Sequence, residues 1–184
     1  MMPAMRIYLV RHSEAVERLP SMPDAARYLS ARGRLSFREM ALRFRDAGGH
    51  PTRILTSPLV RAVQTAEILS EAIRYDGEVV LEPRLSPGFD IAKLNDVLED
   101  SPSEREIAFV GHEPDLGGIL AVLLSLPQGY AMRKGAIGPR SDGRRRPDPR
   151  PARLAPYRGS PNRGPRDAGA VGSCNPPHGV VRCL

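Results

Sequence analysis

Two histidines follow apolar runs that are typical of buried strands. His12 comes after residues 7–10 with Arg11 directly before it, and His112 comes after residues 107–111. In an open α/β sheet, ligands bind at the carboxyl ends of the strands, so we expect side chains at these two ends to lie close together. Neutral imidazole is a nucleophile near pH 7 and a guanidinium binds phosphate oxygens. The pattern therefore predicts an anion-binding site suited to phosphoryl transfer.

A third cation lies between the two histidines in the sequence. Residues 53–56 are typical of a short buried strand, and the segment after Pro58 is typical of a helix with Arg61 at its start. Ser57, between that strand and that helix, has two interpretations. Its hydroxyl donates to the same anion, or it caps the helix ahead of Pro58.

The elements that must position these residues alternate between strand and helix. Strands are predicted at residues 6–10, 53–56, 78–81 and 107–111, and helices at residues 33–47, 62–73, 91–98 and 115–124. This alternation favours an α/β fold of three layers, with a mostly parallel sheet covered by helices on both faces.

The charge of the chain is concentrated at its carboxyl end. The first 134 residues carry 17 basic and 18 acidic residues, whereas residues 135–184 carry the other 10 arginines against 3 aspartates. That second segment is rich in proline and glycine and has no apolar run long enough for a core element, so it is predicted to be disordered. We expect a folded domain at residues 1–137 and a disordered basic tail at residues 138–184.

The positions of the cysteines and the sequence of the amino terminus indicate the cellular compartment. Cys174 and Cys183 both lie in the tail, so the predicted domain has no disulfide or metal framework of cysteines. The chain begins without the apolar region of a signal peptide, and no apolar stretch approaches the length of a membrane span. We expect a cytoplasmic protein that has no membrane partner.

Three motifs together resemble the histidine phosphatase superfamily, which has the phosphoglycerate mutase-like fold. They are residues 10–15, which contain Arg11 and His12, residues 57–65, and residues 110–112. The short chain and the run at residues 112–116 are similar to the SixA-type phosphohistidine phosphatase branch. The chain differs from the superfamily at Ser13, where glycine is most common, and we expect this change to alter the loop without removing the chemistry.

The resemblance implies a role for each candidate residue. His12 would attack phosphorus and form a phosphohistidine that water then hydrolyses. Arg11 and Arg61 would hold the phosphoryl oxygens, and His112, when protonated beside the dianion, would add a donor. The Ser57 hydroxyl would donate to the same oxygens, and no metal or other cofactor is implied. Glu113 is expected to be an ordinary loop carboxylate.

The substrate class is inferred from what the chain lacks. Larger members of the superfamily carry a glutamate that protonates an alkoxide leaving group, but residues 82–90 offer only Glu82 or Asp90. The imidazole of a phosphohistidine leaves phosphorus with little need for protonation, so the prediction is a phosphatase for phosphohistidine on a phosphotransfer protein. The alternative within the superfamily is a phosphomonoesterase for small molecules.

The tail supports two further interpretations. Its arginines, with the run at residues 144–146, could bind nucleic acid or an acidic surface, although Tyr157 is its one aromatic residue and no recognition fold accompanies the charge. Nucleic acid is therefore not the expected partner. The other interpretation is a frameshift after residue 137, because relatives continue into closing antiparallel strands that this chain is predicted to lack. Residues 148–157 can be back-translated so that the next frame gives Thr-Pro-Gly-Arg-Leu-Gly-Trp-Arg-Leu-Thr, which resembles such a strand.

Overall fold

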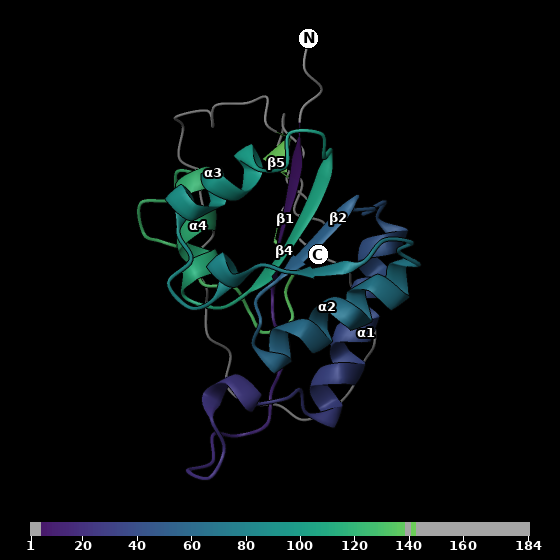
Figure 1. Ribbon diagram of the computed structural model, residues 1–184, viewed down its shortest axis with the longest axis vertical. Helices are drawn as coiled ribbons and strands as arrows, with labels where there is room; N and C mark the ends of the chain where they lie inside the picture. Colours follow the sequence, from purple (N-terminus) through teal and green to yellow (C-terminus); the bar gives the residue numbers. More distant parts are fainter. Residues whose placement is uncertain (1–4, 139–140, 143–184) are drawn as a thin grey trace, which may run out of the picture.

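The computed structural model describes residues 5–138 and the backbone of residues 141–142 (Figure 1). Within that part the sheet has the strand order β3-β2-β4-β1-β5. The pairs β1–β4, β4–β2 and β2–β3 are parallel, and β5 is antiparallel to β1. The strands are β1 (Arg6–Arg11), β2 (Arg53–Thr56), β3 (Val79–Leu81), β4 (Glu106–Gly111) and β5 (Ser141–Asp142). The helices are α1 (Ala31–Asp46), α2 (Val60–Ile73), α3 (Ile91–Glu99) and α4 (Asp115–Leu123), with short 3-10 turns η1 (Asp24–Ala26) and η2 (Pro83–Leu85). The predicted α/β fold is confirmed.

Helices cover both faces of the sheet, with α1 and α2 on one side and α3 and α4 on the other (Figure 1). Side chains alternate along each strand, so Val10 faces α1 and α2 while its neighbour Leu9 faces α3 and α4. On β4, Ala108 likewise faces α1 and α2, and Phe109 faces α3 and α4. This two-sided burial explains why the inner residues of the central strands are apolar on both faces.

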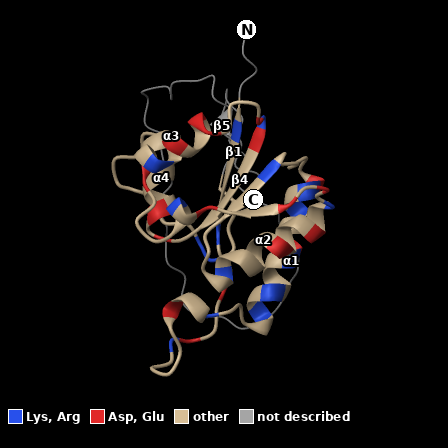
Figure 2. Cartoon of the chain, viewed as in Figure 1, with Lys and Arg blue, Asp and Glu red and all other residues tan. Residues whose placement is uncertain are grey.

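The outer surfaces of α1 and α2 carry both signs of charge (Figure 2). Arg38 on α1 and Glu71 on α2 form an exposed ion pair with an N–O distance of 2.7 Å. An exposed pair of this kind contributes little to stability, about 0–1 kcal/mol. These surfaces are ordinary solvent-facing helix faces.

Caps define the start of two helices. Ser30 precedes α1 and its hydroxyl accepts a hydrogen bond from the backbone of Gly33, whereas the carboxylate of Asp90 accepts from Lys93 at the start of α3. The residue before α2 is Leu59, which makes no side-chain cap. The prediction that Pro58 opens this helix is therefore two residues early, although Arg61 does lie in its first turn.

The segment before β5 closes the sheet along the free edge of β1. Arg11 N donates to the carbonyl of Ala136 at 3.0 Å, and Gly138 N donates to the carbonyl of Leu9 at 2.6 Å. β5 lies within the stretch that we predicted as tail, so the expectation that closing strands are missing meets an exception in this short strand. The predictions for residues 139–140 and 143–184 lie outside the described residues. Among the described helices, none is both long and apolar enough to cross a membrane.

Candidate active site

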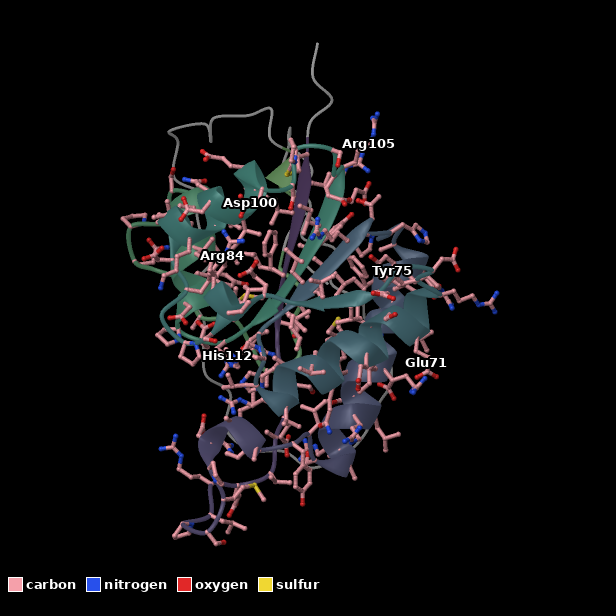
Figure 3. The ribbon with its side chains drawn as sticks, viewed as in Figure 1. Glu71, Tyr75, Arg84, Asp100, Arg105 and His112 are labelled. Carbon is pink, nitrogen blue, oxygen red and sulfur yellow. The ribbon has the colours of Figure 1, made fainter. Side chains whose placement is uncertain are left out.

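The parallel strands β1, β4 and β2 bring three predicted residues to one edge of the sheet. His12, His112 and Ser57 each follow the last residue of one of these strands. The ends of β1 and β4 lie in register, and β2 ends one residue earlier, opposite Val110. The ring centroids of His12 and His112 are 5.2 Å apart. Figure 3 labels His112 at this end of the sheet. The convergence that the sequence predicted is thus present in the structure.

Both ring nitrogens of His12 have partners. Nδ1 lies 2.8 Å from the carbonyl oxygen of Ser13, which can only accept, so Nδ1 carries a proton. Nε2 accepts a hydrogen bond from Nε of Arg61 at 3.3 Å. Burial is the main cause that lowers the pKa of His12 to about 4; the nearby positive charges add to it, and the hydrogen bond to the Ser13 carbonyl opposes it. The ring is neutral near pH 7 with its lone pair on Nε2.

His112 is buried, and its Nε2 lies 2.8 Å from the hydroxyl oxygen of Ser57. Its Nδ1 is buried without a partner among the described residues. Burial, followed by the charge of Arg61, lowers the pKa of His112 to about 4, and the carboxylate of Asp24 opposes that effect. The predicted protonated His112 is therefore a neutral ring here until another negative charge comes close.

Ser57 is positioned by His112 and not by the helix that follows. Its hydroxyl pairs with His112, and its contact with the backbone N–H of Leu59 is long, at 3.4 Å. The interpretation of Ser57 as the N-cap of α2 is wrong, because the cap position belongs to Leu59. Ser57 is fully buried beside the histidine pair.

Arg61 enters the site from the first turn of α2, and its side chain is only 7% exposed. While Nε donates to His12, Nη1 donates to the backbone carbonyl of Asp24 at 2.7 Å and Nη2 to its carboxylate at 2.9 Å. A buried guanidinium needs such partners because desolvating an unpaired charge is costly. Arg61 is the predicted residue whose side chain donates a hydrogen bond to Nε2 of His12.

Asp24 is the residue that sequence reasoning missed. It lies in η1, within the β1–α1 loop of residues 12–30, and its other carboxylate oxygen accepts from Arg18 and Arg27 at 3.0 Å each. Hydrogen bonds from Arg27, Arg18 and Arg61 hold the pKa of Asp24 well below its usual range. No periodic pattern marks this loop, so the sequence carried no signal for the contact with Arg61.

The β1–α1 loop is fastened to the helices at its base. Ala15 and Leu29 form an antiparallel bridge, and the side chain of Gln64 on α2 accepts from Leu29 N at 2.8 Å. The Ser13 hydroxyl donates to the carbonyl of Gly33 at 2.8 Å. A Cβ on Gly33 would lie 2.1 Å from the carbonyl oxygen of Glu14, so only glycine permits this approach. Serine at position 13 therefore ties the loop to α1.

Arg11 is held by a different segment. Its Nη1 donates to the carbonyl of Met132, and its Nε is buried without a partner among the described residues. Met132 N in turn donates to Oε1 of Glu113 at 3.2 Å. Glu113 therefore differs from the ordinary loop carboxylate that we expected, because it fixes the segment that contacts Arg11. The positive charge of Arg11 is close enough to lower the pKa of His12.

The two carboxylates that the sequence offered as acids have other partners. Asp90 caps α3, as described above, and Glu82 forms an ion pair with Arg84 at 2.8 Å. The hydrogen bonds from Arg84 lower the pKa of Glu82, so it stays ionised. Over the described part of the chain, no cluster of three or more His, Cys, Asp or Glu side chains has the arrangement of a metal site.

Comparisons with known proteins show the family of the chain. Residues 7–87 match the histidine phosphatase superfamily (branch 1), a stretch that contains Arg11, His12, Ser57 and Arg61. An uncharacterised protein of Picosynechococcus sp. is 36% identical over 147 residues, which cover 77% of this chain and 88% of that protein. The phosphohistidine phosphatase SixA of Escherichia coli is 26% identical over 121 residues, covering 65% of this chain and 74% of SixA.

Solved structures share the fold. A structure of the protein histidine phosphatase SixA with tungstate superposes with a TM-score of 0.66 at 24% identity, over 73% of this chain and 86% of that one. A mycobacterial glucosyl-3-phosphoglycerate phosphatase superposes with a TM-score of 0.56 at 21% identity, over 74% and 92% of the two chains. The chain belongs to the histidine phosphatase superfamily, within its first branch and with similarity to SixA. This membership makes it an enzyme of the phosphatase class.

Proposed function

We propose that this enzyme hydrolyses phosphohistidine on a protein substrate through a phosphorylated His12. The observation that carries the proposal is the hydrogen bonding of the His12 ring, with Nδ1–H on the Ser13 carbonyl and Nε2 on Nε of Arg61. This arrangement selects the tautomer in which the electron pair lies on Nε2, and Nε2 can attack phosphorus once the Nε–H of Arg61 turns to a phosphoryl oxygen. The neutral imidazole of His12 and the guanidinium of Arg61 thus contact each other at Nε2.

In the first step, Nε2 of His12 attacks phosphorus while the bond from phosphorus to the substrate's ring nitrogen breaks. The electron pair of that bond stays with the departing imidazole. Arg61 and Arg11 bind the phosphoryl oxygens as charge shifts during the transfer. A dianion beside His112 raises the pKa of that ring, so His112 gains a proton only when the phosphoryl group is bound.

In the second step, water attacks the phosphorus on His12 and the bond to Nε2 breaks. Because Nδ1 keeps its proton on the Ser13 carbonyl, the ring leaves as neutral imidazole and needs no acid. One proton of the water stays on the new inorganic phosphate and the other passes to solvent. The free enzyme is then restored with the same tautomer.

The leaving group of the first step favours phosphohistidine over a sugar phosphate. An alkoxide must be protonated as it departs, but Asp90 caps α3, Glu82 is paired with Arg84, and Asp24 is held ionised. The imidazole of a phosphohistidine takes a proton from solvent at its other nitrogen near neutral pH, so it leaves without a protein acid. The similarity to the E. coli phosphohistidine phosphatase supports the same substrate class.

The test compares three substrates at matched concentration: a phosphotransfer domain phosphorylated on histidine, a sugar phosphate and an aryl phosphate. The expected order of kcat/KM places the phosphohistidine domain first and the sugar phosphate last. Faster turnover of the sugar phosphate would favour the small-molecule phosphomonoesterase instead. His12→Ala, which should release no phosphate from any of the three, controls for a contaminating phosphatase.

A further inference from the structure

Asp24 contacts the guanidinium of Arg61 through two acceptors, and the proposed reaction gives Asp24 no role. Its backbone carbonyl and its carboxylate bind Nη1 and Nη2 of Arg61 at 2.7 and 2.9 Å. The two acceptors belong to one residue of the β1–α1 loop, which the Ala15–Leu29 bridge fastens at its base. The loop therefore holds the far end of the guanidinium on which the reaction depends.

The orientation of the guanidinium follows from this contact. Arg61 offers five N–H donors in one plane, of which Nε–H points at Nε2 of His12. One Nη–H runs parallel to Nε–H in that plane, so the edge formed by these two donors faces the nitrogen where phosphorus is to be bound. Asp24 occupies the end of the fork, so this edge can donate to two phosphoryl oxygens once a phosphoryl group lies between Arg61 and His12.

The charges around Asp24 indicate whether its carboxylate would repel a phosphoryl group from Arg61. Its other carboxylate oxygen is bound by Arg18 and Arg27, so the negative charge is balanced on the side away from Arg61. Arg27 also donates from Nε and Nη2 to the carbonyl of Val16, which fixes Arg27 on the loop. The group of Asp24 with these arginines keeps a positive sum, and a phosphoryl dianion is not repelled from it.

We infer that Asp24 is a positioning residue that holds the side edge of Arg61 toward Nε2 of His12. The inference rests on the proposed phosphoryl transfer at His12. A fork aimed at the transferring oxygens lowers the barrier, whereas a free but charged Arg61 would still attract phosphate. Loss of Asp24 should therefore reduce kcat much more than it weakens phosphate binding.

The experiment uses the full chain with Asp24→Ala and Asp24→Asn. Turnover of an aryl phosphate is measured beside the Kd of inorganic phosphate, the melting temperature and the NMR signal of Arg61 Nε–H. We expect kcat of Asp24→Ala to fall by about ten- to a hundredfold, with the Kd for phosphate unchanged or lower and a changed Nε–H signal. Asp24→Asn keeps the side-chain volume and one acceptor oxygen, so its loss should be smaller.

A control separates positioning from general loss of an ion pair. Glu71→Ala breaks the exposed Arg38–Glu71 pair and does not touch Arg61. This variant should keep kcat within about twofold. Added formate, a small carboxylate, should recover part of kcat in Asp24→Ala alone.

Several results would overturn the inference. An unchanged or higher kcat in Asp24→Ala would make Asp24 a bystander or a blocker, and an equal loss of kcat and phosphate binding would make it a binding residue. If Asp24→Ala fails to fold, an Asp24→Asn enzyme with wild-type kcat and an unchanged Arg61 signal would contradict it. If the wild-type enzyme releases no phosphate, the proposed function fails, while the Arg61 signal still tests the contact with Asp24.

Discussion

The end of β1 and the end of β4 each present a histidine, but the two rings are held in different ways. His12 is bonded at both nitrogens, to the Ser13 carbonyl and to Arg61. His112 is bonded at Nε2 to the Ser57 hydroxyl, which can donate or accept, and its Nδ1 has no partner among residues 5–138. The structure fixes the tautomer of the first ring and leaves that of the second free.

In the proposed reaction, this difference suits the two rings to different roles. A nucleophile must keep its electron pair on the reacting nitrogen, which the partners of His12 enforce. A group that responds to the charge of the phosphoryl dianion must be able to change its protonation, and a hydroxyl partner permits this for His112. The comparison thus predicts that substitutions at His12 and its partner Arg61 cost more activity than a substitution at Ser57, the partner of His112.

The largest effect is expected at His12. His12→Ala removes the only side chain that can form the covalent intermediate in the proposed reaction, so kcat should fall by a factor on the order of 10⁴ or more. The measurement is phosphate release at saturating substrate. His50→Ala, at an exposed histidine outside the site, should keep wild-type turnover. A His12→Ala enzyme with more than a few per cent of wild-type kcat would remove His12 from the chemistry.

Arg61→Lys should have the next largest effect. Lysine keeps the charge but loses the planar fork that contacts His12 and Asp24, so kcat should drop by a factor on the order of 10². The matched control is Arg38→Lys, the same change at an exposed ion pair, and it should leave kcat unaltered. Near-normal turnover in Arg61→Lys would mean that charge alone is sufficient at this position.

The protonation of both rings should depend on pH in the same way when no phosphate is bound. Burial lowers the pKa of both histidines from 6.5 to about 4, so the unfolded chain binds their protons first as the pH falls. The stability that these rings contribute is complete above pH 6.5 and is lost progressively from there toward pH 4. NMR titration without phosphate should find both rings neutral from pH 8 to about 5.

Inorganic phosphate should then change the titration of one ring more than the other. The dianion raises the pKa of His112, whose Nδ1 is free to take a proton, more than that of His12. The readout is the pH midpoint of each ring at saturating phosphate. If His12 gains the proton first, the roles that we assign to the rings are reversed.

The smallest effect is expected at Ser57. Ser57→Ala removes the hydrogen bond to Nε2 of His112 without touching His12, so the loss should be about 1 kcal/mol, or about fivefold in kcat. Ser36→Ala, at an exposed serine on α1, is the control and should have no effect. A loss at Ser57 as large as that at Arg61 would give the hydroxyl a direct part in phosphoryl binding.

The grouping of His12, Arg61 and His112 could be predicted because it follows from strand topology. The apolar runs indicated which segments become central parallel strands, and the carboxyl ends of such strands meet at one edge. The partners of these residues could not be predicted in the same way. Asp24 and Glu113 act through loops whose path depends on tertiary packing, and Ser57, the expected cap of α2, pairs instead with His112 at the end of β4.

The carboxyl end shows another limit of sequence reasoning. β5 is two residues long and pairs with β1, which is too short a pattern for periodicity to detect. The boundary at residue 137, the disorder of the tail and its origin in a frameshift stay predictions. Deleting residues 143–184 should leave kcat unchanged, because the candidate residues all lie before residue 113.

The most direct test of the account is the chemical position of phosphate in the trapped intermediate. The wild-type enzyme is mixed with a phosphohistidine domain, quenched in alkali within milliseconds and digested. Mass spectrometry and ³¹P NMR of the peptides then locate the phosphate. The tautomer fixed by the Ser13 carbonyl predicts phosphate on Nε2 of His12. Phosphate on Nδ1 of His12, on His112 or on Ser57 would contradict the account.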